Sequence, residues 1–168
     1  MDHTIAVRDL DNESFARYGQ VLSMPPGPAG RSGEGWRCWY GFFEIDCPRP
    51  LVFGAVVTEA REVVVREMER HVTTFELIYP HDHDLIQVVG PPADLLNEEA
   101  NPVANEAEAF RIPVGSAVLL REGTWHSPAF PMVHATTYGF ACLQYPGTYL
   151  PEWRRFSRDG CVRAVPGN

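Results

Sequence analysis

The stretch Glu69-Arg70-His71-Val72-Thr73-Thr74-Phe75-Glu76 places three potential metal ligands close together in the sequence. Side chains alternate between the two faces of a β-strand, so Glu69 and His71 are expected on the same face. A turn near Thr73-Thr74 would bring Glu76 back beside them from the next strand. The stretch therefore predicts two successive strands that present three ligands to one ion.

A second stretch, Gly123-Thr124-Trp125-His126-Ser127-Pro128, follows about fifty residues later. His126 comes after a Gly-containing turn and before a Pro, so a short loop can place its imidazole beside a neighbouring strand as the fourth ligand. Trp125 would then face the opposite side of that strand. A site of two His and two carboxylates suits Mn²⁺, Fe²⁺, Ni²⁺ or Zn²⁺. We predict a divalent metal site at Glu69, His71, Glu76 and His126; the alternative is that both carboxylates are solvated and His71 is an edge residue.

The rest of the chain has the pattern of an all-β protein. Short segments rich in β-branched and aromatic residues, separated by turn formers, predict strands at 36–45, 51–58, 62–68, 75–79, 85–89, 110–113, 117–120 and 134–145. No helical period extends over ten residues between 36 and 145, which disfavours parallel βαβ architectures. We predict one domain over residues 1–168 with an antiparallel double-sheet jelly-roll barrel and short flanking helices.

The flanking segments are interpreted from their capping and turn residues. Residues 11–19 offer capping residues, then Phe15 and Tyr18, then a Gly, which predicts a short helix. Residues 23–35 and 91–108 are rich in turn formers or Pro and predict loops. Pro151 near the start of residues 151–156 predicts a C-terminal helix.

Composition narrows the function classes. A formal net charge of −8, with no basic cluster longer than Arg154-Arg155, argues against nucleic acid and anionic membranes as partners. The chain has neither a signal-peptide pattern nor an apolar run of ~18 residues, so we expect a cytoplasmic protein. Cys38, Cys47, Cys142 and Cys161 form no C-x-x-C pair and are expected to be reduced thiols. A small-molecule substrate is the expected partner.

Several motifs together resemble the ureidoglycolate lyase family of the cupin superfamily. They are E-R-H at 69–71, Pro80 at the end of the next strand, the Pro-containing turn that ends 85–92, G-T-W-H-S-P at 123–128, and S-F-A-R-Y-G at 14–19. The resemblance covers about residues 5 to 145 and implies a homodimeric cupin enzyme that splits ureidoglycolate into glyoxylate and urea. Ser127 departs from the second His that these lyases carry, and Glu76 stands where that family often has an amide. Glu76 is the residue of the metal-binding cupins.

This resemblance implies catalytic roles for His71, Glu76 and His126. A metal at the two histidines would acidify a bound hydroxyl, and Glu69 or Glu76 would act as the base. The predicted substrate-binding residues are Trp125 and Tyr79, as parts of an aromatic wall, and Arg111, as a carboxylate clamp. The other candidates are Phe42, Phe75, Tyr138 and Phe140 for the wall and Arg121 for the clamp.

Two alternatives to the lyase remain open. The same barrel and metal would serve an isomerase or lyase for a sugar acid, and a cupin that binds a metabolite without turnover would share the fold. The H-x-H of His81 and His83 falls at a predicted turn and is interpreted as solvated.

Overall fold

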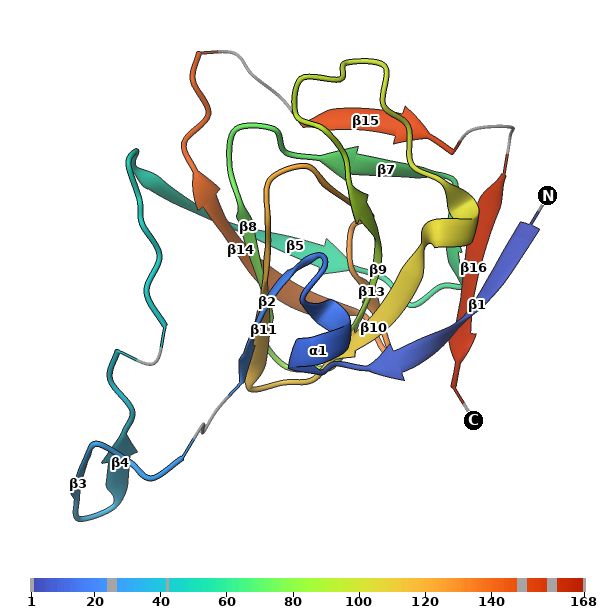
Figure 1. Cartoon of the computed structure of the whole chain (residues 1–168). Helices are drawn as coiled ribbons and strands as arrows, with labels where there is room; N and C mark the ends of the chain where they lie inside the picture. The colour runs from blue at the N-terminus through green and yellow to red at the C-terminus, as the bar shows by residue number, and fades with distance from the viewer. Residues whose placement is uncertain (1, 24–26, 42, 148–150, 157–159, 168) are drawn as a thin grey trace.

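Two β-sheets face each other across the interior of the protein, and a separate pair of strands projects from them (Figure 1). The computed structural model describes residues 2–23, 27–41, 43–147, 151–156 and 160–167. We call the sheet of nine strands the large sheet and the sheet of five strands the small sheet.

The large sheet runs in the order β15 (Glu152–Arg155), β7 (Glu67–Arg70), β12 (Thr124–His126), β9 (Leu85–Pro92), β10 (Glu108–Ile112), β1 (Asp2–Asp9), β16 (Cys161–Pro166) and β6 (Val63–Val65), with β13 (Phe130–Pro131) paired to β9. The small sheet has the order β2 (Gly19–Ser23), β11 (Ser116–Leu120), β8 (Glu76–Pro80), β14 (Thr136–Leu143) and β5 (Leu51–Thr58). The projecting pair is β3 (Arg31–Gly33) and β4 (Trp36–Cys38). Helical structure in the described residues is limited to α1 (Asn12–Phe15) and the 3₁₀ turn η1 (Ala104–Glu106).

Buried side chains form two clusters, one on each face of the large sheet. Between the sheets, Val89 and Phe110 of the large sheet pack with Ile78 and Val118 of the small sheet. On the other face, Trp125 packs in a cluster that includes alanines of the segment between β9 and β10, at residues 93–107. The interior between the sheets therefore lies on the opposite side of β12 from Trp125.

The predicted fold class, an all-β double-sheet jelly-roll barrel, is confirmed. The prediction of antiparallel pairing needs one correction, because β1 runs parallel to both β10 and β16. The helix predicted near residues 11–19 is present as α1, where the Asp11 side chain accepts hydrogen bonds from the backbone N–H groups of Glu13 and Ser14 at 2.9 Å.

The predicted C-terminal helix at 151–156 is wrong. These residues form β15, which pairs with β7 in the register Glu152 to Arg70 and Arg155 to Glu67. The Arg70 guanidinium, which is fully buried, lies 2.8 Å from the Glu152 carboxylate, so a tertiary contact fixes the extended backbone. Pro151 precedes a strand here, which is also a position where Pro is tolerated.

Strand boundaries follow the predictions closely in the central part of the chain. Residues 51–58 form β5 as predicted, whereas 62–68 divides into β6 and β7. Among the described residues of 36–45, strand structure is limited to the three residues of β4. The loop predicted at 91–108 includes the end of β9, η1 and the start of β10. All four cysteines are free. Among the described residues, no helix has the length and apolar character needed to cross a bilayer.

Candidate metal centre

Four side chains named as ligands in the sequence meet between the two sheets. Glu69 lies on β7 and His126 on β12, and the two are direct partners in the register of the large sheet. His71 follows the end of β7, and Glu76 opens β8 in the small sheet. The cluster therefore spans both sheets.

The turn between β7 and β8 is fixed by hydrogen bonds from distant parts of the chain. The Thr74 hydroxyl accepts a bond from the Leu143 N–H at 2.7 Å, and the carbonyl of His71 accepts one from the Gly123 N–H at 2.8 Å. Gly123 has φ +79°, and a Cβ there would come within 2.7 Å of the Ala93 carbonyl oxygen. Gly123 therefore holds the segment that carries His126 beside the segment that carries His71.

The donor atoms lie at separations suited to one small cation. Glu69, His71 and His126 each offer a ligand atom, and these atoms all lie within 4.8 Å of one another. A Glu76 carboxylate oxygen is 2.9 Å from Nε2 of His126 and 3.4 Å from Nε2 of His71. Glu69 is the more distant carboxylate, with 3.8 Å between its Oε1 and Nε2 of His126. All four side chains point into the same space.

The two imidazoles are held so that their Nε2 atoms face the cluster. Nδ1 of His126 lies 2.9 Å from the Thr124 carbonyl oxygen, so the neutral ring donates its Nδ1–H there and carries its lone pair on Nε2. Nδ1 of His71 lies 2.8 Å from the Tyr145 hydroxyl. Both Nε2 atoms are buried, and neither has an aligned hydrogen bond among the described residues. A bare lone pair 2.9 Å from the Glu76 carboxylate is repulsive, so a cation or a proton belongs between them.

The charges of the cluster depend on one another. Burial opposes ionisation of Glu76, but its contacts with His126 and His71 outweigh burial and lower the pKa of Glu76 to about 2. Burial likewise opposes the charged form of His126, yet the Glu76 carboxylate raises the pKa of this imidazole overall. Burial raises the pKa of Glu69 above its usual value. Glu76 is thus held as a carboxylate beside two nitrogen ligands, which is a donor set that fits Mn²⁺, Fe²⁺, Ni²⁺ or Zn²⁺.

Three residues predicted to bind substrate are placed away from this cluster. Trp125 is 2% exposed and packs on the other face of the large sheet, where the Arg70 guanidinium lies 5.0 Å from its ring centroid. Tyr79 lies on the outer face of the small sheet, because it alternates with Ile78 and covers Gly139 there. Arg111 is half-exposed and pairs with Asp84 at 2.7 Å. The substrate contacts predicted for Trp125, Tyr79 and Arg111 would therefore lie outside the cluster of Glu69, His71, Glu76 and His126.

The other predicted wall and clamp residues have mixed positions. Tyr138 is buried in the interior cluster, and its hydroxyl accepts a hydrogen bond from the Ala129 N–H at 3.3 Å. Phe140 alternates to the same face as Tyr138. Arg121 donates to the carbonyl oxygen of Ala16 and does not point inward. Phe42 lies outside the described residues.

Two residues beside the cluster were not predicted. Tyr145, in the segment after β14, reaches His71, and burial raises the pKa of its phenol. Trp153, on β15, is the direct register partner of Glu69. Trp153 was missed from the sequence because residues 151–156 were predicted to form a helix. The side chain lies beside Glu69 only because this segment is a strand paired with β7.

The fold and the cluster together define an all-β protein: a two-sheet barrel with a His/Glu set in its interior. No protein-family model and no curated protein sequence matches the chain. Among solved structures, the chain is similar to RmlC from Streptococcus suis, described in complex with dTDP-D-xylose, at 12% identity and a TM-score of 0.43. The match covers 58% of this chain and 46% of that one, so the chain corresponds to less than half of RmlC.

Proposed function

We propose that the protein is a metal-dependent enzyme that acts on a small hydroxy acid inside the barrel. One observation carries the proposal: two buried histidine Nε2 atoms without aligned hydrogen bonds face two carboxylates in the same space. Unsatisfied buried nitrogen atoms are costly in a protein interior, and a divalent cation would satisfy both at once. The finer proposal, cleavage of ureidoglycolate to glyoxylate and urea, rests on the sequence resemblance.

Each residue of the cluster has a role in this proposal. His71, His126 and Glu76 would hold the ion, because the Glu76 carboxylate contacts both imidazoles. When bound, the ion would polarise a substrate oxygen and make a hydroxyl easier to deprotonate. The Thr124 carbonyl and the Tyr145 hydroxyl fix the ring orientations of the two histidines.

Glu69 is the carboxylate best placed to serve as the base. It is the more loosely held of the two, at 3.8 Å from His126, and it adjoins the half-exposed Trp153 on the next strand. In ureidoglycolate cleavage, Glu69 would accept the hydroxyl proton as the carbon–oxygen bond becomes the carbonyl of glyoxylate. The carbon–nitrogen bond breaks in the same process, and the urea nitrogen takes up a proton.

The test combines metal analysis with product detection. Protein purified without added metal should contain close to one equivalent of a transition metal, and should release glyoxylate and urea from ureidoglycolate. Glu69→Gln should keep the metal and lose turnover, while Glu122→Gln, an exposed carboxylate on the turn before Gly123, should change neither. Metal without turnover on any hydroxy acid would favour a metabolite-binding cupin, and protein that binds no transition metal would refute the proposal.

A further inference from the structure

Trp153 stands beside the proposed metal centre on the face of the large sheet that carries Glu69. Directly opposite residues of an antiparallel pair project to the same face, and Glu69 is opposite Trp153 on one side and His126 on the other. Glu152, next to Trp153, confirms the alternation because it reaches Arg70 on the opposite face. His126, Glu69 and Trp153 thus form one row across three neighbouring strands. Trp153 is 42% exposed, so this row reaches solvent at β15.

The next row along the same face pairs Arg155 with Glu67. Two residues along a strand span about 7 Å, so this row lies about one such step from Glu69. A hollow of about 280 Å³ opens here, and the residues around it are Arg61, Val64, Val65, Arg66, Glu67, Ser127, Pro128, Phe130 and Trp153. Ser127 and Pro128, which follow His126 in the chain, are among these residues.

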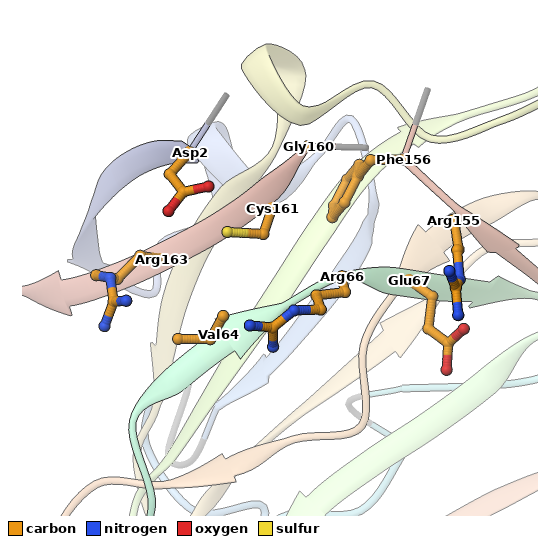
Figure 2. A pocket seen from close by; sticks show the side chains of 9 residues that line it. All are labelled: Asp2, Val64, Arg66, Glu67, Arg155, Phe156, Gly160, Cys161 and Arg163. Atoms are coloured by element: carbon orange, nitrogen blue, oxygen red, sulfur yellow. The ribbon is translucent and has the colours of Figure 1, made fainter. Parts of the chain in front are cut away.

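A second hollow of about 360 Å³ lies next to the first, because both are lined by Val64, Arg66 and Glu67. Figure 2 shows the guanidinium groups of Arg66, Arg155 and Arg163 around it, with Glu67 beside Arg155 and Asp2 beside Cys161. We call the two hollows together the arginine groove.

Two guanidinium groups of the arginine groove are free to bind a ligand. Arg163 lies 2.6 Å from the Glu62 carboxylate, but the side chains of Arg66 and Arg155 have no hydrogen bond or ion pair to any described residue. Guanidinium groups bind carboxylate and phosphate oxygens through two parallel donors. The second hollow is lined by three guanidinium groups and by the carboxylates of Glu67 and Asp2, and Arg163 among the three is already paired with Glu62.

We propose that the arginine groove binds the anionic end, carboxylate or phosphate, of the substrate that reacts at the metal centre. Trp153 covers the part of the substrate that crosses from Glu69 to Arg155, and Arg66 with Arg155 holds the anion. This proposal rests on the proposed metal-dependent reaction of a hydroxy acid and not on ureidoglycolate as the substrate, and anion binding itself needs no metal. The rows of Glu69 and Glu67 lie about 7 Å apart, one two-residue step along the strand. The substrate class is therefore hydroxy acids with an oxyanion well separated from the reacting hydroxyl, which are longer than ureidoglycolate, where one carbon carries both the hydroxyl and the carboxylate.

Calorimetric titration of the protein tests the groove with benzoate, phenyl phosphate and the neutral analogue benzamide as probes. Each titration is run on protein as purified and again after EDTA treatment. One of the anions should bind in both preparations, more weakly at high salt, and benzamide should bind at least tenfold more weakly. Comparison of benzoate with phenyl phosphate shows which oxyanion the groove prefers.

Variants then locate the bound anion. Arg155→Gln and Arg66→Gln should each weaken binding about tenfold, in line with the loss of a charge-assisted hydrogen bond. Arg17→Gln, the same change at an exposed arginine outside the groove, should weaken it less than twofold. Trp153→Ala should also weaken binding while metal content stays the same.

Three results would overturn the proposal: equal affinity for benzoate and benzamide, anion binding that EDTA abolishes, or equal effects of Arg155→Gln and Arg17→Gln. Failure of the proposed function has a different signature, because a protein without metal or turnover would still bind the anions in the groove.

Discussion

Replacement of Trp125 by Ala should destabilise the fold strongly without removing the metal centre. Trp125 is 2% exposed and belongs to the cluster on the far side of β12 from His126. A buried Trp side chain covers about 200 Å² of apolar surface, and truncation of such residues costs about 3–5 kcal/mol. The change also removes the ring over the fully buried Arg70 guanidinium, which lies 5.0 Å from its centroid. We expect the free energy of unfolding to fall by about 4 kcal/mol, a large share of the ~5–15 kcal/mol of a typical domain.

Urea denaturation followed by circular dichroism measures this change. For a chain of this length, a loss of about 4 kcal/mol corresponds to a melting temperature about 8–16 °C lower. Trp36→Ala is the matched control, since Trp36 is 54% exposed and should cost less than about 1 kcal/mol. Metal content per folded molecule should be unchanged in both variants. A Trp125→Ala protein that unfolds like the wild type, or that folds normally but loses its metal, would refute the placement of Trp125 outside the site.

Other substitutions test the site, the surface and the small sheet. His126→Ala should abolish metal binding and turnover with an unchanged circular dichroism spectrum; a normal metal content would show that this histidine is no ligand. Burial opposes ionisation of Asp84, but hydrogen bonds from the Val114 N–H and the Arg111 guanidinium outweigh burial and lower the pKa of Asp84. The ionised form of Asp84 therefore stabilises the fold above the unfolded pKa of 3.8. The stability gap between wild type and Asp84→Asn should therefore be full at pH 7 and shrink as pH falls below about 4 in thermal melts, and a constant gap would contradict the assignment. A Cβ on Gly139 would lie 2.2 Å from the Tyr79 ring, so Gly139→Ala should cost about 1–3 kcal/mol in urea denaturation. The double variant with Tyr79→Ala should recover part of that loss, and strict additivity would argue against the contact.

The strands near the candidate site could be predicted because their signals are local. Residues 51–58 combine β-branched residues with flanking turn formers, and they form β5 as predicted. The convergence of Glu69, His71 and His126 followed from side-chain alternation and from the turn at Gly123. Such features depend on a few neighbouring residues.

The rest of the large sheet could not be predicted, because it depends on long-range pairing. β1 pairs with β10 and β16, which lie more than a hundred residues later, and no local pattern encodes these partners. Residues 151–156 carry a helix-start signal, yet β15 forms because Glu152 pairs with the buried Arg70. Tertiary contacts override local propensity in such segments.

The roles of aromatic and arginine residues also depended on the strand face. Trp125 precedes His126 in the sequence but packs on the other side of the sheet, whereas Trp153 lies beside Glu69 because of the register of β15. Arg111 resembles a carboxylate clamp in the sequence, but Asp84 already occupies its guanidinium. The sheet register decides which of these side chains lies on the face of the metal cluster, and the sequence alone does not give that register.

Metal analysis of the purified wild-type protein beside the His71→Ala/His126→Ala double variant tests the central claim most directly. Both proteins are purified without added metal and measured by inductively coupled plasma mass spectrometry. The wild type should carry close to one equivalent of a single transition metal, and the double variant should carry less than a tenth of that amount while it remains folded. Equal metal content in the two folded proteins, or no transition metal in the wild type after incubation with Mn²⁺, Fe²⁺, Ni²⁺ and Zn²⁺ in turn, would contradict the account.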